Sequence, residues 1–138
     1  MIRVYADMVA DLFHYGHVEF LKKARALGDY LIVGVHNDQV STDWKRPPIL
    51  SMDQRLAVVA ACRYVDEALP NAPELPDREW ISKHNIDLMV HGDDMSESDL
   101  NHYYGVPIKM GIFRTVRYTK GISTTEIIRR CKEIDLKV

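Results

Sequence analysis

The chain has 138 residues, a formal net charge of −2, and 46% hydrophobic and 28% charged residues. This length and composition predict one domain over residues 1–138 with a single packed core. The near-neutral charge argues against a general nucleic-acid binder, which carries a basic excess. Cys62 and Cys131 indicate neither a disulfide framework nor a zinc site. Without a signal-like segment or an apolar run near ~20 residues, we expect no membrane span and a cytoplasmic protein.

The first half of the chain alternates strand and helix patterns. Residues 2–5 predict a strand, and residues 17–27 repeat apolar side chains at helical spacing. Residues 30–35 are a nearly continuous apolar run, which is typical of a parallel strand covered on both faces. The polar stretch that follows ends in Pro47-Pro48 and predicts a loop, because paired prolines break regular structure.

The second half continues the alternation. Ser51 is the expected N-cap of a helix that reaches about residue 62. In chain order we then expect a strand at 64–68, a loop at 70–76, a helix at 77–84, a strand at 86–90, a strand near 112–117 and a helix at 124–132 capped by Ser123 or Thr124. Residues 91–105 show no clear period. This order predicts an α/β fold with a doubly wound parallel sheet, which binds ligands at the carboxyl ends of its strands.

His14-Tyr15-Gly16-His17 follows the first predicted strand, at the expected ligand-binding end of the sheet. Histidines can donate hydrogen bonds to phosphates, and a helix N-terminus adds unpaired N–H groups and a positive dipole end. Gly16 would let an anion approach the backbone. The alternative is a structural or capping histidine pair. Neither Gly-x-Gly-x-x-Gly nor a Walker A motif is present, so a bound nucleotide would need other chemistry.

A second cluster, Arg117-Tyr118-Thr119-Lys120-Gly121-Ile122-Ser123-Thr124-Thr125, lies just before the last predicted helix. Its cations, glycine and hydroxyls form a second candidate phosphate cradle. The alternative is an ordinary Ser/Thr cap with a solvated basic turn.

Together the two clusters resemble the cytidylyltransferases that act on phosphocholine, phosphoethanolamine and glycerol 3-phosphate. That family carries His-x-Gly-His early and Arg-Thr-x-Gly-Ile-Ser-Thr late. The resemblance extends to Tyr5-Ala6-Asp7, Asp11–His14, Gly28–Val35, Lys45 before Pro47-Pro48, Arg55, Arg63–Glu67 and His91-Gly92-Asp93-Asp94. It implies a Rossmann-like nucleotidyltransferase fold and attack of an acceptor phosphate oxygen on the α-phosphorus of CTP, with release of pyrophosphate.

The resemblance also implies a role for each matching residue. Catalytic roles fall to His14, His17 and Lys45; nucleotide contacts to Asp11, Gly16, Asp93, Arg117, Gly121, Ile122, Ser123 and Thr124; acceptor contacts to Arg55, Asp94 and Glu74. Mg²⁺ would bridge the phosphates of CTP, with no dedicated protein ligands. The Arg63–Glu67 match implies a homodimer. Structural alternatives are a solvated loop for Lys45, a surface helix for Arg55, a turn for Asp93-Asp94 and a helix cap for Asp11.

The chain departs from the family pattern at three places. Met8-Val9-Ala10-Asp11 replaces the usual Gly-x-Phe-Asp, Tyr118 stands where the family has Arg, and Arg46 stands where Gly is common. Arg117 would reach the same phosphate only with a shift in the strand end, because successive strand residues face opposite sides.

The sequence leaves several acceptor substrates, and more than one activity, open. Glu74, Asp93 and Asp94 suit a primary ammonium, which favours phosphoethanolamine over phosphocholine, whose quaternary ammonium needs an aromatic cage. Glycerol 3-phosphate, 2-hydroxyethylphosphonate and 2-aminoethylphosphonate remain alternatives for a cytidylyltransferase. An adenylyltransferase of the same superfamily and a non-catalytic CTP-binding protein are the other two candidates.

Overall fold

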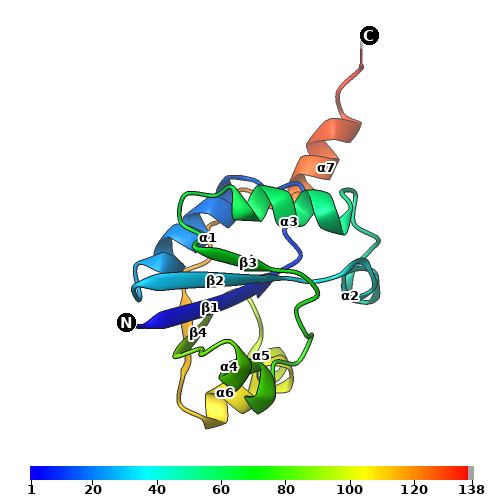
Figure 1. Cartoon of the computed structure of the whole chain (residues 1–138). Helices are drawn as coiled ribbons and strands as arrows, with labels where there is room; N and C mark the ends of the chain where they lie inside the picture. Colours follow the sequence, from blue (N-terminus) through cyan, green and yellow to red (C-terminus); the bar gives the residue numbers. More distant parts are fainter. Residues whose placement is uncertain (137–138) are drawn as a thin grey trace.

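The computed structural model describes residues 1–136, in which a five-stranded parallel sheet lies between two layers of helices (Figure 1). The strands are β1 (Arg3–Met8), β2 (Tyr30–Val35), β3 (Glu67–Leu69), β4 (Leu88–Gly92) and β5 (Phe113–Val116). The helices are α1 (Tyr15–Arg25), α2 (Asp38–Trp44), α3 (Met52–Ala60), α4 (Arg78–Lys83), α5 (Glu97–Tyr103), α6 (Gly105–Lys109) and α7 (Thr124–Lys132). The predicted Rossmann-like α/β fold is confirmed.

The strand order is β3-β2-β1-β4-β5. The chain builds the sheet outward from β1 through β2 to β3, then crosses to the other side of β1 for β4 and β5. Val4 in β1 therefore pairs with Leu31 on one side and Leu88 on the other. The order reverses between β1 and β4, and the carboxyl ends of these two strands form the place where open α/β sheets bind ligands.

The two faces of the sheet pack against different helices. Side chains alternate along β1, so that Val4 and Ala6 join a core cluster with α1 and α3. Tyr5 points to the opposite face, where it packs against α4, α6 and neighbouring residues. Figure 1 shows α1 and α3 on one side of the sheet and α4, α5 and α6 on the other. Burial on both faces explains the continuous apolar run of β2.

Most of the predicted elements are present, and the differences have local causes. The bounds of β2 and α7 match the prediction, and Ser51 and Ser123 are the N-caps of α3 and α7. The predicted loop before Pro47 contains α2 instead, a short polar helix begun by Asn37, whose side chain accepts from the Val40 N–H. Residues 91–105 contain α5 and the start of α6. Such short helices lack a readable apolar period.

β3 begins at Glu67 and not at residue 64. The Asp66 carboxylate accepts a hydrogen bond from the Leu31 N–H and forms an ion pair with Arg25. These contacts hold the chain before the strand begins. Tyr64 and Val65 pack against the α1–α3 side of the core, where the prediction had placed strand residues.

Arg55 on α3 is fully buried and does not line the pocket described below. Its guanidinium donates hydrogen bonds to three backbone carbonyls, those of Val9, His36 and Leu50, and forms an ion pair with Asp38 at 2.6 Å. A guanidinium with this set of partners is a structural tie between loops, so its geometry gives no support to the predicted acceptor contact.

None of the helices in residues 1–136 has the length and apolar character needed to cross a membrane. The homodimer and the cytoplasmic location stay predictions.

Replacing Arg55 with methionine is expected to lower the free energy of unfolding by about 3 kcal/mol or more, because buried carbonyls lose their donor. Urea denaturation measures the loss. Arg78→Met, at an exposed arginine, is the matched control and should unfold near the wild-type midpoint. Wild-type stability for Arg55→Met, with a raised KM for an acceptor, would mean that the buried role is wrong.

Candidate active site

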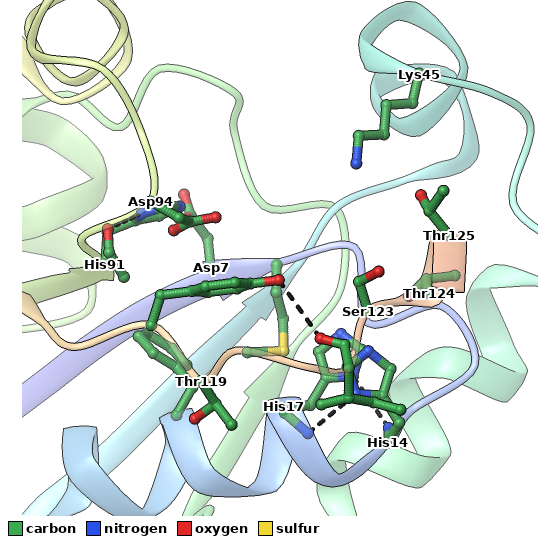
Figure 2. A pocket seen from close by; sticks show the side chains of 16 residues that line it. Asp7, His14, His17, Lys45, His91, Asp94, Thr119, Ser123, Thr124 and Thr125 are labelled. Atoms are coloured by element: carbon green, nitrogen blue, oxygen red, sulfur yellow. Dashed lines mark hydrogen bonds between the residues drawn. The ribbon is translucent and has the colours of Figure 1, made fainter. Parts of the chain in front are cut away.

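A pocket of about 260 Å³ opens at the carboxyl ends of β1 and β4 (Figure 2). It is lined by Asp7, Met8, His14, Gly16, His17, Phe20, Lys45, His91, Gly92, Asp94, Tyr118, Thr119, Ile122, Ser123, Thr124 and Thr125. These residues come from the ends of β1 and β4, the start of α1, the end of α2 and the segment leading into α7. The topology therefore brings the two sequence clusters together with Lys45.

His14 and His17 form the N-terminal cap of α1. The His14 Nδ1 accepts a hydrogen bond from the Gly16 N–H at 3.0 Å, and the His17 Nδ1 accepts from the His14 N–H at 3.1 Å. An acceptor nitrogen carries no proton, so a neutral ring in either position carries its proton on Nε2. The cap thus converts both histidines into Nε2–H donors, and the capping alternative and the ligand-binding role are compatible.

Both histidines are held in the neutral form. Burial lowers the pKa of His17 to about 3, with a smaller contribution from nearby His14, and burial also lowers the pKa of His14. The ring centroids are 4.0 Å apart, a spacing that opposes charging both rings. Position 16 has no room for a larger residue than glycine, because a Cβ there would lie 2.8 Å from His14 Cε1 and 3.2 Å from Ile122 Cγ2.

The start of α7 forms the facing wall. Ser123 caps the helix by accepting from the Glu126 N–H, and the Thr124 hydroxyl donates to the Asp11 carbonyl at 2.8 Å. Ser123, Thr124 and Thr125 all line the pocket. Two helix N-termini, those of α1 and α7, therefore border one cavity, and both favour bound negative charge.

Lys45 enters the pocket from a third direction. It directly follows α2 as the C-cap residue, and Figure 2 shows its side chain reaching toward the space between Asp94 and the start of α7. The structure therefore brings Lys45 to the same cavity as the two sequence clusters, and its role beside a transferred phosphate stays a prediction.

Asp7, His91 and Asp94 line the end of the pocket away from the histidine pair. Asp7 is 6% exposed, and its Oδ1 accepts a hydrogen bond from the Tyr104 hydroxyl at 2.6 Å. Its Oδ2 has no hydrogen-bond partner within residues 1–136, and His36 Nε2 lies 3.6 Å away. Oδ2 and His36 Nε2 are both buried and face each other, so Tyr104 and His36 flank the Asp7 carboxylate where this residue lines the pocket.

Asp7 received no role from the sequence. Its signal was present, because it is the acidic residue near the carboxyl end of a strand whose central residues, Val4 to Ala6, carry no charge. Met8 and His91 also line the pocket without an individual role from the sequence, and Tyr118, Thr119 and Thr125 line it as members of the second candidate phosphate cradle.

Of the four predicted nucleotide contacts that lie outside the pocket lining, Asp11, Asp93 and Gly121 shape the loops around it. Both Asp11 carboxylate oxygens accept backbone hydrogen bonds, from the Ile49 and Leu50 N–H groups. Asp93 Oδ1 accepts from the Tyr118 N–H. Gly121 has φ +90°, a left-handed conformation that glycine permits, and it sets the turn before Ile122. The two aspartates and Gly121 therefore position the loop segments whose other residues line the pocket.

Arg117 and Tyr118 follow the end of β5 and are placed differently. Arg117 is exposed and absent from the pocket lining, while Tyr118 lines it. The structure therefore does not bring Arg117 to the position of the family arginine.

Met8 needs no special backbone. It is the last residue of β1, paired with Val35, and the left-handed residues of this loop are Ala10 (φ 59°) and Leu12 (φ 50°). The methionine side chain lines the pocket.

His17→Asn tests the buried neutral histidine. The folded pKa of about 3 lies below the ordinary 6.5, so the unfolded chain binds more protons between these values. The free energy of unfolding should therefore fall as the pH drops through this window, by up to about 1.4 kcal/mol per pH unit from this group. Asparagine keeps an acceptor for the His14 N–H, and urea titrations at several pH values should show a shallower slope. An unchanged slope would contradict the assignment.

Comparison with known proteins gives the family. A family described as cytidylyltransferase-like matches residues 6–130. The ethanolamine-phosphate cytidylyltransferase of Dictyostelium discoideum is 44% identical over 133 residues, which cover 92% of this chain and 37% of that protein. The human choline-phosphate cytidylyltransferase A is 39% identical over 132 residues, covering 94% and 36%. The chain thus spans less than half the length of these curated relatives.

A solved structure of another protein is also similar to this chain. The lipopolysaccharide core biosynthesis protein from Thermoplasma volcanium GSS1 is 31% identical with a TM-score of 0.69, covering 88% of this chain and 99% of that one. With the matched residues 6–130 including both histidines, Lys45 and the start of α7, the chain belongs to the cytidylyltransferase-like family.

Proposed function

We propose that this domain transfers CMP from CTP to a small phosphate or phosphonate acceptor, with phosphoethanolamine favoured, and releases pyrophosphate. The observation that carries the proposal is the division of the pocket. Neutral histidines and two helix N-termini lie at one end, the acidic residues Asp7 and Asp94 lie at the other, and Lys45 reaches in between. Ethanolamine-phosphate cytidylyltransferases among the relatives support this choice.

The histidine end suits the triphosphate. The Nε2–H groups of His14 and His17 can donate to phosphate oxygens without carrying charge in the free protein. The N-terminus of α7 and the hydroxyls of Ser123 and Thr124 would hold the β- and γ-phosphates from the opposite wall. These donors are fixed by helix caps before the substrate arrives, which is how a site stabilises developing charge at low reorganisation cost.

Lys45 lies where the bond exchange would occur. An acceptor phosphate oxygen forms a bond to the α-phosphorus of CTP, and the bond from that phosphorus to the oxygen bridging to the β-phosphate breaks. The electron pair leaves with pyrophosphate. The protein supplies no covalent nucleophile, so its work is positioning and charge stabilisation. The Lys45 ammonium would neutralise the charge of two approaching phosphates.

The Asp7 end suits the organic part of the acceptor. Tyr104 fixes the Asp7 carboxylate through Oδ1, and this carboxylate, which lines the pocket together with Asp94, would accept from an ammonium or a hydroxyl. Phosphoethanolamine and 2-aminoethylphosphonate bring an N–H donor, and glycerol 3-phosphate and 2-hydroxyethylphosphonate bring an O–H donor. The quaternary ammonium of phosphocholine brings none, so it is the least suited of these acceptors.

Mg²⁺ would bind with the nucleotide. Asp7 and Asp94 are the carboxylates in the pocket lining, and residues 1–136 contain no cluster of three metal-ligating side chains. A Mg²⁺ here would take most of its ligands from phosphate and water, which agrees with its ordinary preference. When bound, the ion would neutralise phosphate charge.

A pyrophosphate-release assay with CTP and each of five acceptors tests the proposal. We expect release with phosphoethanolamine and a fall in kcat of about 100-fold or more for Lys45→Ala, since a fixed cation at the reacting phosphates is lost. Arg78→Ala, at an exposed site outside the pocket lining, should retain activity. Release with ATP in place of CTP would favour an adenylyltransferase. No release with any acceptor, and its appearance in Tyr118→Arg, would favour a non-catalytic CTP-binding protein.

Asp7→Asn should raise the KM for phosphoethanolamine by about 10- to 100-fold, the value of one charge-assisted hydrogen bond, with little change in the KM for CTP. Steady-state kinetics with each substrate varied separately measures both. Asp93→Asn is the matched control, because Asp93 does not line the pocket and asparagine can still accept from Tyr118. A larger effect on CTP than on the acceptor would contradict the proposed orientation.

A further inference from the structure

The position of Lys45 depends on its neighbours in the chain. It is exposed, it follows a helix of only seven residues, and its ammonium makes no hydrogen bond or ion pair within residues 1–136. A long flexible side chain at the end of a short polar helix has many accessible positions. Something must hold the backbone of this segment if the ammonium is to stay over the pocket.

Trp44, the preceding residue, is clamped on three sides. Its indole Nε1–H donates a hydrogen bond to Glu74 Oε1 at 2.8 Å. Its ring packs edge-on against His36, with centroids 5.1 Å apart, and against Tyr103 at 5.3 Å. His36 is fully buried and bonded to the Ala72 carbonyl, so this part of the clamp is fixed.

The following residue is tied to the other wall of the pocket. Arg46 donates from Nη1 to the Thr125 hydroxyl at 3.3 Å, and its carbonyl accepts from the Ser41 hydroxyl. Lys45 is thus held between a contact to Glu74 on one side and a contact to the start of α7 on the other. Of the two, the Trp44–Glu74 bond is shorter, less exposed and assisted by a full carboxylate charge.

We propose that the Trp44–Glu74 hydrogen bond holds the Lys45 ammonium over the pocket, which makes Trp44 and Glu74 positioning residues for the transfer step. The inference rests on the proposed function, and it gives Glu74 a different role from the acceptor contact expected from the sequence. Neither Trp44 nor Glu74 lines the pocket, and Glu74 Oε1 is already occupied by the indole.

Steady-state kinetics of Glu74→Ala and Glu74→Gln separates the two roles. For a positioning role, Glu74→Ala lowers kcat by about 10- to 100-fold, the cost of a displacement of about 1 Å, with both KM values nearly unchanged. Glu74→Gln stays within about threefold of wild type, because an amide oxygen still accepts from the indole. If both variants raise the KM for the acceptor alike, Glu74 contacts the acceptor ammonium and the proposal is wrong.

A double variant tests whether the effect passes through the lysine. In a Lys45→Ala background, Glu74→Ala should cause little further loss of kcat, since the group that it positions is already absent. Trp44→Phe, which keeps a ring but lacks the N–H, should resemble Glu74→Ala. Full additivity of Lys45→Ala and Glu74→Ala would overturn the proposal.

Hydrogen exchange of residues 38–46, followed by mass spectrometry, tests the anchor without activity. Glu74→Ala should speed exchange in this segment severalfold, whereas Glu74→Gln and the exposed control Glu79→Ala should not. Unchanged exchange in Glu74→Ala overturns the anchor even in an active enzyme. A protein with no pyrophosphate release but with the expected exchange pattern would refute the proposed function and leave the anchor standing.

Discussion

The buried guanidinium of Arg55 is the interaction on which the arrangement of the pocket depends. It joins the Val9 carbonyl, in the loop that leads to the histidine pair, to the His36 carbonyl and the Asp38 carboxylate, where the lysine-bearing helix begins. One planar group with five donors can satisfy several loops at once, which a lysine or an apolar residue could not. The segment after β1 and the segment after β2 thereby keep a fixed separation at the carboxyl ends of these strands.

Polar groups at the start of α1 and in the neighbouring loops also form structural hydrogen bonds that arrange the pocket. The hydrogen bonds that cap the helix also fix the tautomer of His14 and His17, so a structural requirement prepares both rings as donors. Asp11 ties the histidine loop to Ile49 and Leu50 through its side chain and to Thr124 through its carbonyl. The catalytic potential of the pocket therefore comes from polar groups that are largely pre-arranged by the fold, as electrostatic catalysis requires.

The sequence predicted the parts of this account that depend on periodicity and order. Alternating strands and helices indicated the sheet, and its topology then placed His14, Lys45 and Ser123 around one cavity. What the sequence could not supply was the direction of each polar side chain. Arg55 faces the core, while Asp7, which is also buried, lines the pocket, and nothing in their local patterns separates the two cases. Burial of polar groups depends on contacts between distant segments, such as the bond between Asp7 and Tyr104.

The proposed chemistry depends on whether the capped histidine pair receives the triphosphate of CTP. The ¹⁵N chemical shifts of the two imidazoles, followed by NMR at neutral pH, test it most directly. We predict neutral rings protonated on Nε2 in the free protein, and a change at both Nε2 atoms on addition of CTP with Mg²⁺ but not on addition of cytidine. Rings protonated on Nδ1, or shifts that do not respond to CTP, would contradict the account.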